Sequence, residues 1–216
     1  MKVILEGITG SKAYGLDTPE SDTDIKGVIL YPTEKILSLS KGKETVNRTD
    51  PDIEHHEVEK FIRLASKCNP SILELLFLEN YRILTDEGKL LVSIRNAFLN
   101  KTIYNSYGGY AVQQAKRLYK KAQQGAKHTR HDKHARHCFR LLFQGKELLE
   151  TGSLTVRLKN PQIFFDIGQM PIDEMIDLFE IKLRELNDTK TDLPEKPDYD
   201  LINKTLLSIR RDNYNV

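Results

Sequence analysis

The stretch GSKAYGLDTPESDTDIKGV, residues 10–28, follows a short apolar run, Val3-Ile4-Leu5, that has the composition of a buried strand. Gly10 permits a tight turn after this strand, and Ser11 can cap the turn or helix that follows. Backbone N–H groups exposed at such a turn, with a hydroxyl beside them, suit the oxygens of phosphate groups. The stretch therefore predicts a strand, an anion-binding turn and a second strand in succession.

Two carboxylates, Asp22 and Asp24, stand two residues apart at the start of the second predicted strand. In an extended segment their side chains leave from the same face. Adjacent carboxylates repel each other unless a cation lies between them, and hard oxygen ligands suit Mg²⁺ or Mn²⁺. For a third ligand we choose Glu54, in a predicted strand over 52–56, with Asp52 on the same face as the alternative. Three such acids predict a two-metal site for phosphoryl transfer, in which the third completes the second metal site or takes a proton.

The composition is that of an ordinary globular protein, with 216 residues, 39% of them hydrophobic and 30% charged. No apolar run approaches the roughly 18 residues that span a bilayer, and Glu6 interrupts any secretory apolar segment. Cys68 and Cys138 are too few for a disulfide framework. We therefore expect a cytoplasmic protein that does not contact membranes.

Charge is unevenly distributed along the chain. Ten lysines and arginines lie from Lys116 to Lys146, whereas ten acids and four bases lie from Asp173 to Asp200. A basic middle indicates a face that meets an anion. Lys133, His137 and Arg140 have the i, i+4, i+7 spacing of one helix face, and we expect them to bind a nucleotide's phosphates. A solvated basic helix is the alternative.

The apolar periodicity predicts an α+β protein. The region of residues 1–100 reads as a small α/β unit, and residues 101–216 read as an α-helical domain with basic central helices. Gly108-Gly109 is expected to separate two helices, and residues 154–168 are expected to be irregular or strand-like. The predicted strands cover 2–8, 24–31 and 52–56, and the predicted helices cover about 58–65, 70–77, 86–98, 110–124, 129–150, a segment from 171, and a last segment to about 211.

Gly10-Ser11, a ten-residue gap and Asp22-x-Asp24 resemble the signature of DNA polymerase β-like nucleotidyltransferases. The whole of residues 10–28 looks more specifically like the RlaP-type branch, which is predicted to act in RNA repair. Two later blocks agree with that branch: KFIRLASKCNPSILELL at 60–76, and KHARHCFRLL at 133–142 followed by ELLETG at 147–152. The ordered blocks extend the resemblance over residues 2 to about 156.

The resemblance implies a nucleotidyltransferase fold, a mixed twisted sheet with helices that carries its acids on neighbouring strands. It further implies transfer of a nucleoside monophosphate from a nucleoside triphosphate to a hydroxyl group, with release of pyrophosphate. Asp22, Asp24 and Glu54 would hold the metals, although the family's third acid usually lies between two apolar residues and His55 follows Glu54 here. The basic middle favours RNA, for example tRNA, as the acceptor. The alternatives are transfer of AMP to a protein hydroxyl, as in toxin-neutralising enzymes, and a non-catalytic nucleotide-binding or RNA-binding module. The sequence predicts neither the nucleotide nor the oligomeric state.

Overall fold

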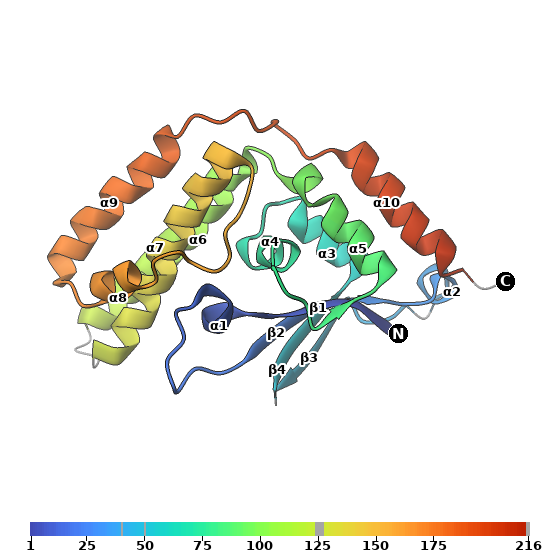
Figure 1. Cartoon of the computed structure of the whole chain (residues 1–216), viewed down its shortest axis with the longest axis horizontal. Coiled ribbons are helices and arrows are strands. Elements are labelled where there is room, and N and C mark those ends of the chain that lie inside the picture. The colour runs from blue at the N-terminus through green and yellow to red at the C-terminus, as the bar shows by residue number, and fades with distance from the viewer. Residues whose placement is uncertain (40, 50, 124–127, 215–216) are drawn as a thin grey trace. The chain divides into compact units, whose positions relative to one another are not determined.

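A mixed five-stranded sheet organises the N-terminal part of this computed structural model (Figure 1), which describes residues 1–39, 41–49, 51–123 and 128–214. The strand order is β3-β4-β2-β1-β5. The central strand β2 pairs antiparallel with β1 and parallel with β4. The strands are β1 Lys2–Thr9, β2 Asp24–Leu30, β3 Thr45–Thr49, β4 Asp52–Glu57 and β5 Ile83–Leu84. The expected α+β class is confirmed. Because β2 lies between β4 and β1, side chains of both strands lie next to those of β2.

Short helices connect these strands. Figure 1 shows α3, α4 and α5 on one side of the sheet. Helix α3 buries an apolar stripe that includes Phe61 and Ile62, and α4 begins with Asn69 as its N-cap and Pro70 in its first turn. The helices that follow β1 and precede residue 100 are α1 Gly10–Tyr14, α2 Thr33–Leu37, α3 Val58–Ala65, α4 Pro70–Leu76, α5 Asp86–Ser93 and the 3₁₀ helix η1 Arg95–Phe98.

The chain divides into two units. The sheet unit consists of Met1–Ala13, Asp17–Leu99 and Pro197–Val216, and the helical unit consists of Tyr14–Leu16 and Asn100–Lys196. The last helix, α10 Tyr199–Asp212, therefore belongs with the sheet and not with the residues 101–216 that we expected to form one domain.

Specific contacts hold α10 to the sheet unit. Arg210 Nη2 lies 2.7 Å from Glu57 Oε1 at the end of β4, and both side chains are almost buried. Thr33 Oγ1 donates a hydrogen bond of 2.6 Å to the carbonyl oxygen of Arg210. Because an apolar helix face is stable only when it is covered, the burial of Ile202 and Ile209 makes α10 part of this unit's core.

The helical unit is built on two long helices, α6 Thr102–Gln123 and α7 His128–Thr151, with α8 Gln162–Gly168 and α9 Ile172–Asp188 beside them. Its core includes an edge-to-face contact between Phe139 and Phe179, whose ring centroids are 6.3 Å apart. Two predictions are wrong here. Helix α6 runs straight through Gly108-Gly109, and residues 162–168 of the segment expected to be irregular are helical. The expected helix end at residue 124 lies outside the described residues.

Helix α6 is continuous although a glycine in a helix interior costs roughly 1 kcal/mol relative to alanine. A methyl group at Gly108 would meet Leu183 and Leu186 of α9 at 3.6 Å, an ordinary van der Waals distance, and one at Gly109 would meet nothing within 4 Å. The space around them therefore does not require glycine, and the burial of Tyr107 and Ala111 on either side offsets the cost.

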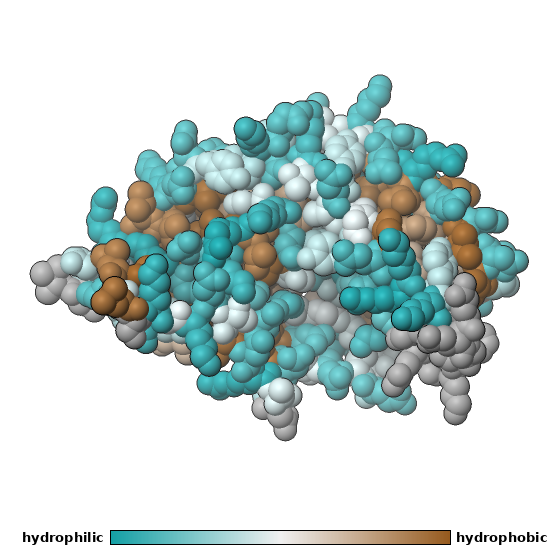
Figure 2. Space-filling model, turned by 180° about the vertical axis from the view of Figure 1, so that it is seen from behind, coloured by the Kyte–Doolittle hydropathy of each residue, from teal (hydrophilic) through white to brown (hydrophobic). Residues whose placement is uncertain are grey.

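The surface carries mainly polar side chains. On the face shown in Figure 2, hydrophilic residues predominate and hydrophobic ones lie in separate groups. None of the helices in the described part of the chain has the length and apolar character to cross a bilayer.

Candidate active site

The turn after β1 lies directly against a carboxylate of β2. Gly10 has a φ of +68°, a conformation that L side chains rarely adopt. A Cβ atom built on Gly10 would lie 2.0 Å from Oδ2 of Asp24, so any side chain there would displace the carboxylate. The backbone at Gly10 therefore lies directly against the carboxylate of Asp24.

The two predicted aspartates occupy different local positions. Asp24 is the first residue of β2 and is partly buried, whereas Asp22 is exposed in the loop before the strand. Lys12, in α1, donates a hydrogen bond through Nζ to Thr23 Oγ1. Since Thr23 lies between the two aspartates, this contact ties their segment to the helix that begins at the glycine turn.

The pairing of β2 with β4 distinguishes the two candidates for the third carboxylate. In this parallel ladder Asp24 is the partner of Asp52, whereas Glu54 is the partner of Lys26. Paired residues on adjacent strands are about 4.8 Å apart and point to the same face. Asp52, the alternative, therefore lies beside Asp24, while the role of either acid stays a prediction.

Glu54 is already held by a lysine. Its Oε2 lies 2.6 Å from Lys26 Nζ. Burial alone would raise the pKa of Glu54, but the hydrogen bond and charge of Lys26, together with the charges of His56 and Lys60, outweigh burial and lower it below its ordinary value. A carboxylate that already neutralises a lysine is a poorer ligand for a cation than the exposed Asp52.

A row of basic side chains continues the carboxylate face toward the end of β4. His56 Nδ1 is 3.0 Å from Thr45 Oγ1, and Lys60 Nζ donates to the same hydroxyl at 2.5 Å. Burial lowers the pKa of His56 below its ordinary value, so the imidazole is neutral near pH 7. Sequence reasoning missed Lys26, His56 and Lys60, although the alternation Asp52, Glu54, His56 along β4 indicates a shared face.

The carboxylates are not gathered into a closed metal site. In the part of the chain that the structure describes, no group of three or more His, Cys, Asp or Glu side chains is placed to hold an ion. The donor chemistry nevertheless fits Mg²⁺ or Mn²⁺, because Asp22, Asp24 and Asp52 offer hard carboxylate oxygens.

The three predicted nucleotide-binding residues of α7 do not share an exposed face. Lys133 is exposed, His137 is partly buried, and Arg140 is only 1% exposed in the core of the helical unit. Burial and then the charge of Arg140 lower the pKa of His137 to about 3, so it carries no charge near pH 7. Nucleotide binding by these residues stays a prediction, and only Lys133 has the exposure and charge that it needs.

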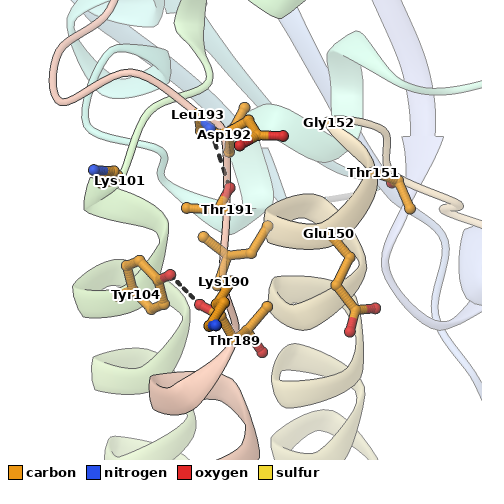
Figure 3. A pocket seen from close by; sticks show the side chains of 11 residues that line it. Lys101, Tyr104, Glu150, Thr151, Gly152, Thr189, Lys190, Thr191, Asp192 and Leu193 are labelled. Atoms are coloured by element: carbon orange, nitrogen blue, oxygen red, sulfur yellow. Dashed lines mark hydrogen bonds between the residues drawn. The ribbon is translucent and has the colours of Figure 1, made fainter.

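A pocket of about 880 Å³ lies in the helical unit (Figure 3) and is lined from α6, the end of α7 and residues 189–193. Tyr104 donates its hydroxyl proton to the carbonyl oxygen of Thr189, and Leu193 N donates to Thr191 Oγ1 at 3.2 Å. Its described lining includes none of the predicted catalytic or nucleotide-binding residues. The pocket therefore adds nothing to the candidate active site.

The chain matches a known family over most of its length. The model of the RNA repair pathway DNA polymerase beta family, RlaP, covers residues 1–162 of 216. The match includes every candidate residue discussed above, from Gly10 to Arg140.

Two individual proteins are similar to the chain. An uncharacterized 38.9 kDa protein from the nrdC-mobD intergenic region of Enterobacteria phage T4 is 30% identical over 129 residues, which are 53% of this chain and 38% of the phage protein. The matched part is thus well under half of that relative's length. A nucleotidyltransferase-like protein from Exiguobacterium sibiricum 255-15 aligns in structure with a TM-score of 0.38 and 9% identity, over 97% of this chain and 74% of that chain. The family match, and not this weak structural likeness, carries the assignment.

Proposed function

We propose that this chain, which belongs to the RNA repair pathway DNA polymerase beta family, transfers a nucleoside monophosphate from a nucleoside triphosphate to a hydroxyl group of RNA. The observation that carries the proposal is a row across three strands. Thr9 pairs with Asp24 and Asp24 pairs with Asp52, while the Gly10 turn lies against Asp24. The row brings an anion-binding turn and two carboxylates from distant parts of the sequence to one end of the sheet.

Asp22, Asp24 and Asp52 would hold divalent cations, most simply Mg²⁺. Bound there, such ions would neutralise charge on the triphosphate and lower the pKa of the acceptor hydroxyl. The chain's own part would be to supply the carboxylate oxygens and to hold the triphosphate with the N–H groups and hydroxyl of Gly10-Ser11. Lys26 and Lys60 add positive charge to the same face of the sheet.

In the proposed reaction the acceptor oxygen forms a bond to the α-phosphorus, and the bond from that phosphorus to the bridging oxygen of pyrophosphate breaks. The proton of the acceptor hydroxyl goes to a carboxylate, for which Asp52 is exposed and adjacent to Asp24. Positioning and charge stabilisation supply most of the rate enhancement in such transfers.

RNA is the proposed acceptor for two reasons. The family's description places it in RNA repair. The helical unit also exposes Lys116, Arg117 and Lys120 on α6 and Lys133 on α7, and exposed basic side chains bind nucleic-acid phosphates without sequence preference. We expect binding that weakens steeply as salt concentration rises.

The test is incubation of the protein with each α-³²P-labelled nucleoside triphosphate, Mg²⁺ and pooled tRNA, followed by separation of RNA and protein. Asp24→Asn should lower transfer by about 100-fold or more, because a metal ligand contributes several kcal/mol to transition-state stabilisation. Asp52→Asn and Glu54→Gln are a matched pair. Each removes one negative charge, and the two positions are two residues apart on the same strand. We expect a loss of similar size for Asp52→Asn and a change within a few-fold for Glu54→Gln.

The alternatives give different results in the same assay. Label on protein instead of RNA would indicate a protein nucleotidyltransferase. Tight triphosphate binding that does not respond to Mg²⁺, with no transfer to either acceptor, would refute the enzymatic proposal in favour of a nucleotide-binding module. A larger loss for Glu54→Gln than for Asp52→Asn would refute the assignment of the third carboxylate.

A further inference from the structure

The face of the sheet that carries Asp24 continues to the edge strand β3. Ladder partners point to the same face, so two rows of this face, read from β3 through β4 to β2, are Thr49-Asp52-Asp24 and Asn47-Glu54-Lys26. The two β3 side chains and Asp52 are exposed, and Glu54 and Lys26 are partly exposed. An open polar surface therefore extends from Asp24 to the edge of the sheet, entirely within the sheet unit.

The order of the strands puts different elements on the two sides of Asp24. Strand β1, which ends at the Gly10 turn, is one neighbour of β2, and β4 is the other. In phosphoryl transfer the attacking and leaving oxygens are roughly in line, with the phosphorus between them. Because the proposed function holds the triphosphate at the Gly10-Ser11 turn, pyrophosphate would leave on the β1 side. The acceptor hydroxyl would then approach from the side of β4 and β3.

Lys60, on helix α3, supplies positive charge on the acceptor side. Its Nζ donates to Thr45 Oγ1 at 2.5 Å, and among the described residues it takes part in no ion pair. Lys26, by contrast, lies 2.6 Å from Glu54 Oε2. A lysine ammonium has three donors, so the partly exposed Lys60 can keep its contact with Thr45 and still donate to a phosphate oxygen.

The position of Lys60 suits a phosphate away from the reacting hydroxyl. Thr45 pairs with His56, which lies four residues beyond Asp52 on β4, or about 13 Å along the strand. Lys60 therefore lies well beyond the reach of an oxygen held beside Asp52. A nucleic-acid acceptor carries phosphates along its whole backbone, so one of them can meet Lys60 while the hydroxyl lies beside Asp52. A protein hydroxyl brings no such group.

We propose that Asn47, Thr49 and Lys60 form the acceptor site, in which Lys60 binds a backbone phosphate of RNA and the two β3 side chains hydrogen-bond to its sugar or phosphate oxygens. Phosphate contacts fix the register of a bound strand, so this contact directs the acceptor hydroxyl toward Asp52. The site rests on the proposed function, because the in-line argument starts from the place of the triphosphate.

Arg48 offers a matched control on the same strand. It is exposed and pairs with Ile53, so it points to the opposite face from Asn47. Lys60→Gln, Asn47→Asp and Arg48→Gln each make the net charge more negative by the same amount. A general loss of attraction for RNA therefore appears in all three variants, whereas loss of the acceptor site appears only in the first two. Because Asn47 is exposed on an edge strand, Asn47→Asp is the variant that disturbs folding least.

Equilibrium binding of fluorescently labelled pooled tRNA, measured at several salt concentrations, tests the site without reference to transfer. We expect Lys60→Gln and Asn47→Asp each to raise Kd about fivefold relative to Arg48→Gln. Lys60→Gln should also reduce the slope of log K against log salt concentration by about one, because one phosphate contact is lost. If Lys60→Gln fails to fold, Asn47→Asp decides the question. Equal Kd values in Arg48→Gln and Asn47→Asp would overturn the proposal.

The transfer assay described above separates the acceptor from the triphosphate. Lys60→Gln and Asn47→Asp should raise KM for tRNA about fivefold and leave KM for the nucleoside triphosphate within twofold of wild type. A rise in KM for the triphosphate alone would place these side chains at the triphosphate and overturn the proposal. Transfer to tRNA with both KM values unchanged would also overturn it, while the proposed function would stand. If the wild-type protein transfers no nucleotide, the proposed function fails, and weaker tRNA binding by the two variants would still support a nucleic-acid site on this face.

Discussion

Gly10→Ala, compared with a control glycine, should separate the effect of the turn on nucleotide transfer from the effect of backbone strain on stability. The backbone at residue 10 has a φ of +68°, and an alanine in this region costs about 1–2 kcal/mol. The added methyl group would also lie 2.0 Å from Asp24 Oδ2 and 2.9 Å from its carboxyl carbon. Since both contacts are far shorter than van der Waals distance, either the turn or the carboxylate must move.

Gly152→Ala is the matched control. Gly152 has a φ of +64° at the end of α7, and a methyl group there would meet its nearest atom, Leu193 Cδ2, at 4.0 Å. The backbone cost is therefore the same as at Gly10, without the clash. We expect Gly152→Ala to lower the free energy of unfolding by about 1–2 kcal/mol, or the melting temperature by several degrees, and to leave nucleotide transfer within twofold of wild type.

The assay combines thermal unfolding with transfer of label from an α-³²P-labelled nucleoside triphosphate at a temperature where both variants are folded. Gly10→Ala should lose at least as much stability as Gly152→Ala. It should also lose about 100-fold in transfer, because the displaced Asp24 carboxylate could no longer hold the proposed cation. Transfer by Gly10→Ala within threefold of wild type would refute the link between the turn and Asp24. Equal losses of transfer in the two variants would show that backbone strain alone accounts for them.

Two further predictions concern stability. Arg210→Met should lower the free energy of unfolding in urea by about 3 kcal/mol, because it leaves Glu57 buried without its ion-pair partner. Glu57→Gln in the same background should recover part of that loss. An unchanged free energy of unfolding in Arg210→Met would contradict the role of this pair in holding α10. The pKa of His137 is about 3 in the folded protein and about 6.5 in the unfolded chain. Between these pH values the unfolded chain binds one more proton at this residue than the folded protein does. The free energy of unfolding therefore falls as pH drops below 6.5, by about 1.4 kcal/mol per pH unit from this group. His137→Gln should remove that share of the slope between pH 6.5 and 5 in urea unfolding. An unchanged slope would contradict the burial of a neutral imidazole.

Sequence patterns identified the elements of the site but not their pairing. The strand before Gly10, the strand that begins near Asp24 and the strand that begins at Asp52 all follow from short apolar or alternating runs, and each occurs in the structure. The choice between Asp52 and Glu54 did not follow, because both lie on one face of the same strand. Only the register of β4 against β2, which depends on contacts across 28 residues of sequence, places Asp52 beside Asp24.

The wrong predictions for the helical unit have a different origin. Gly108-Gly109 has low helix propensity, yet the burial of neighbouring residues of α6, among them Tyr107 and Ala111, keeps the helix continuous. The short apolar segment that became α8 could be read as strand or helix, since periodicity is ambiguous over so few residues. Arg140 has the spacing of an exposed basic stripe, and nothing in that spacing reveals a tyrosine more than a hundred residues earlier against which it stacks.

The place of α10 in the sheet unit has a consequence for how the protein is made. Helix α10 is the last element of the sheet unit to be synthesised, so that unit cannot complete its core until residues 199–212 have left the ribosome. Until then the apolar surface that later receives Ile202 and Ile209 is open to solvent or to a chaperone. A released chain truncated shortly before residue 199 should therefore resist protease in the middle of its sequence and be sensitive near its beginning.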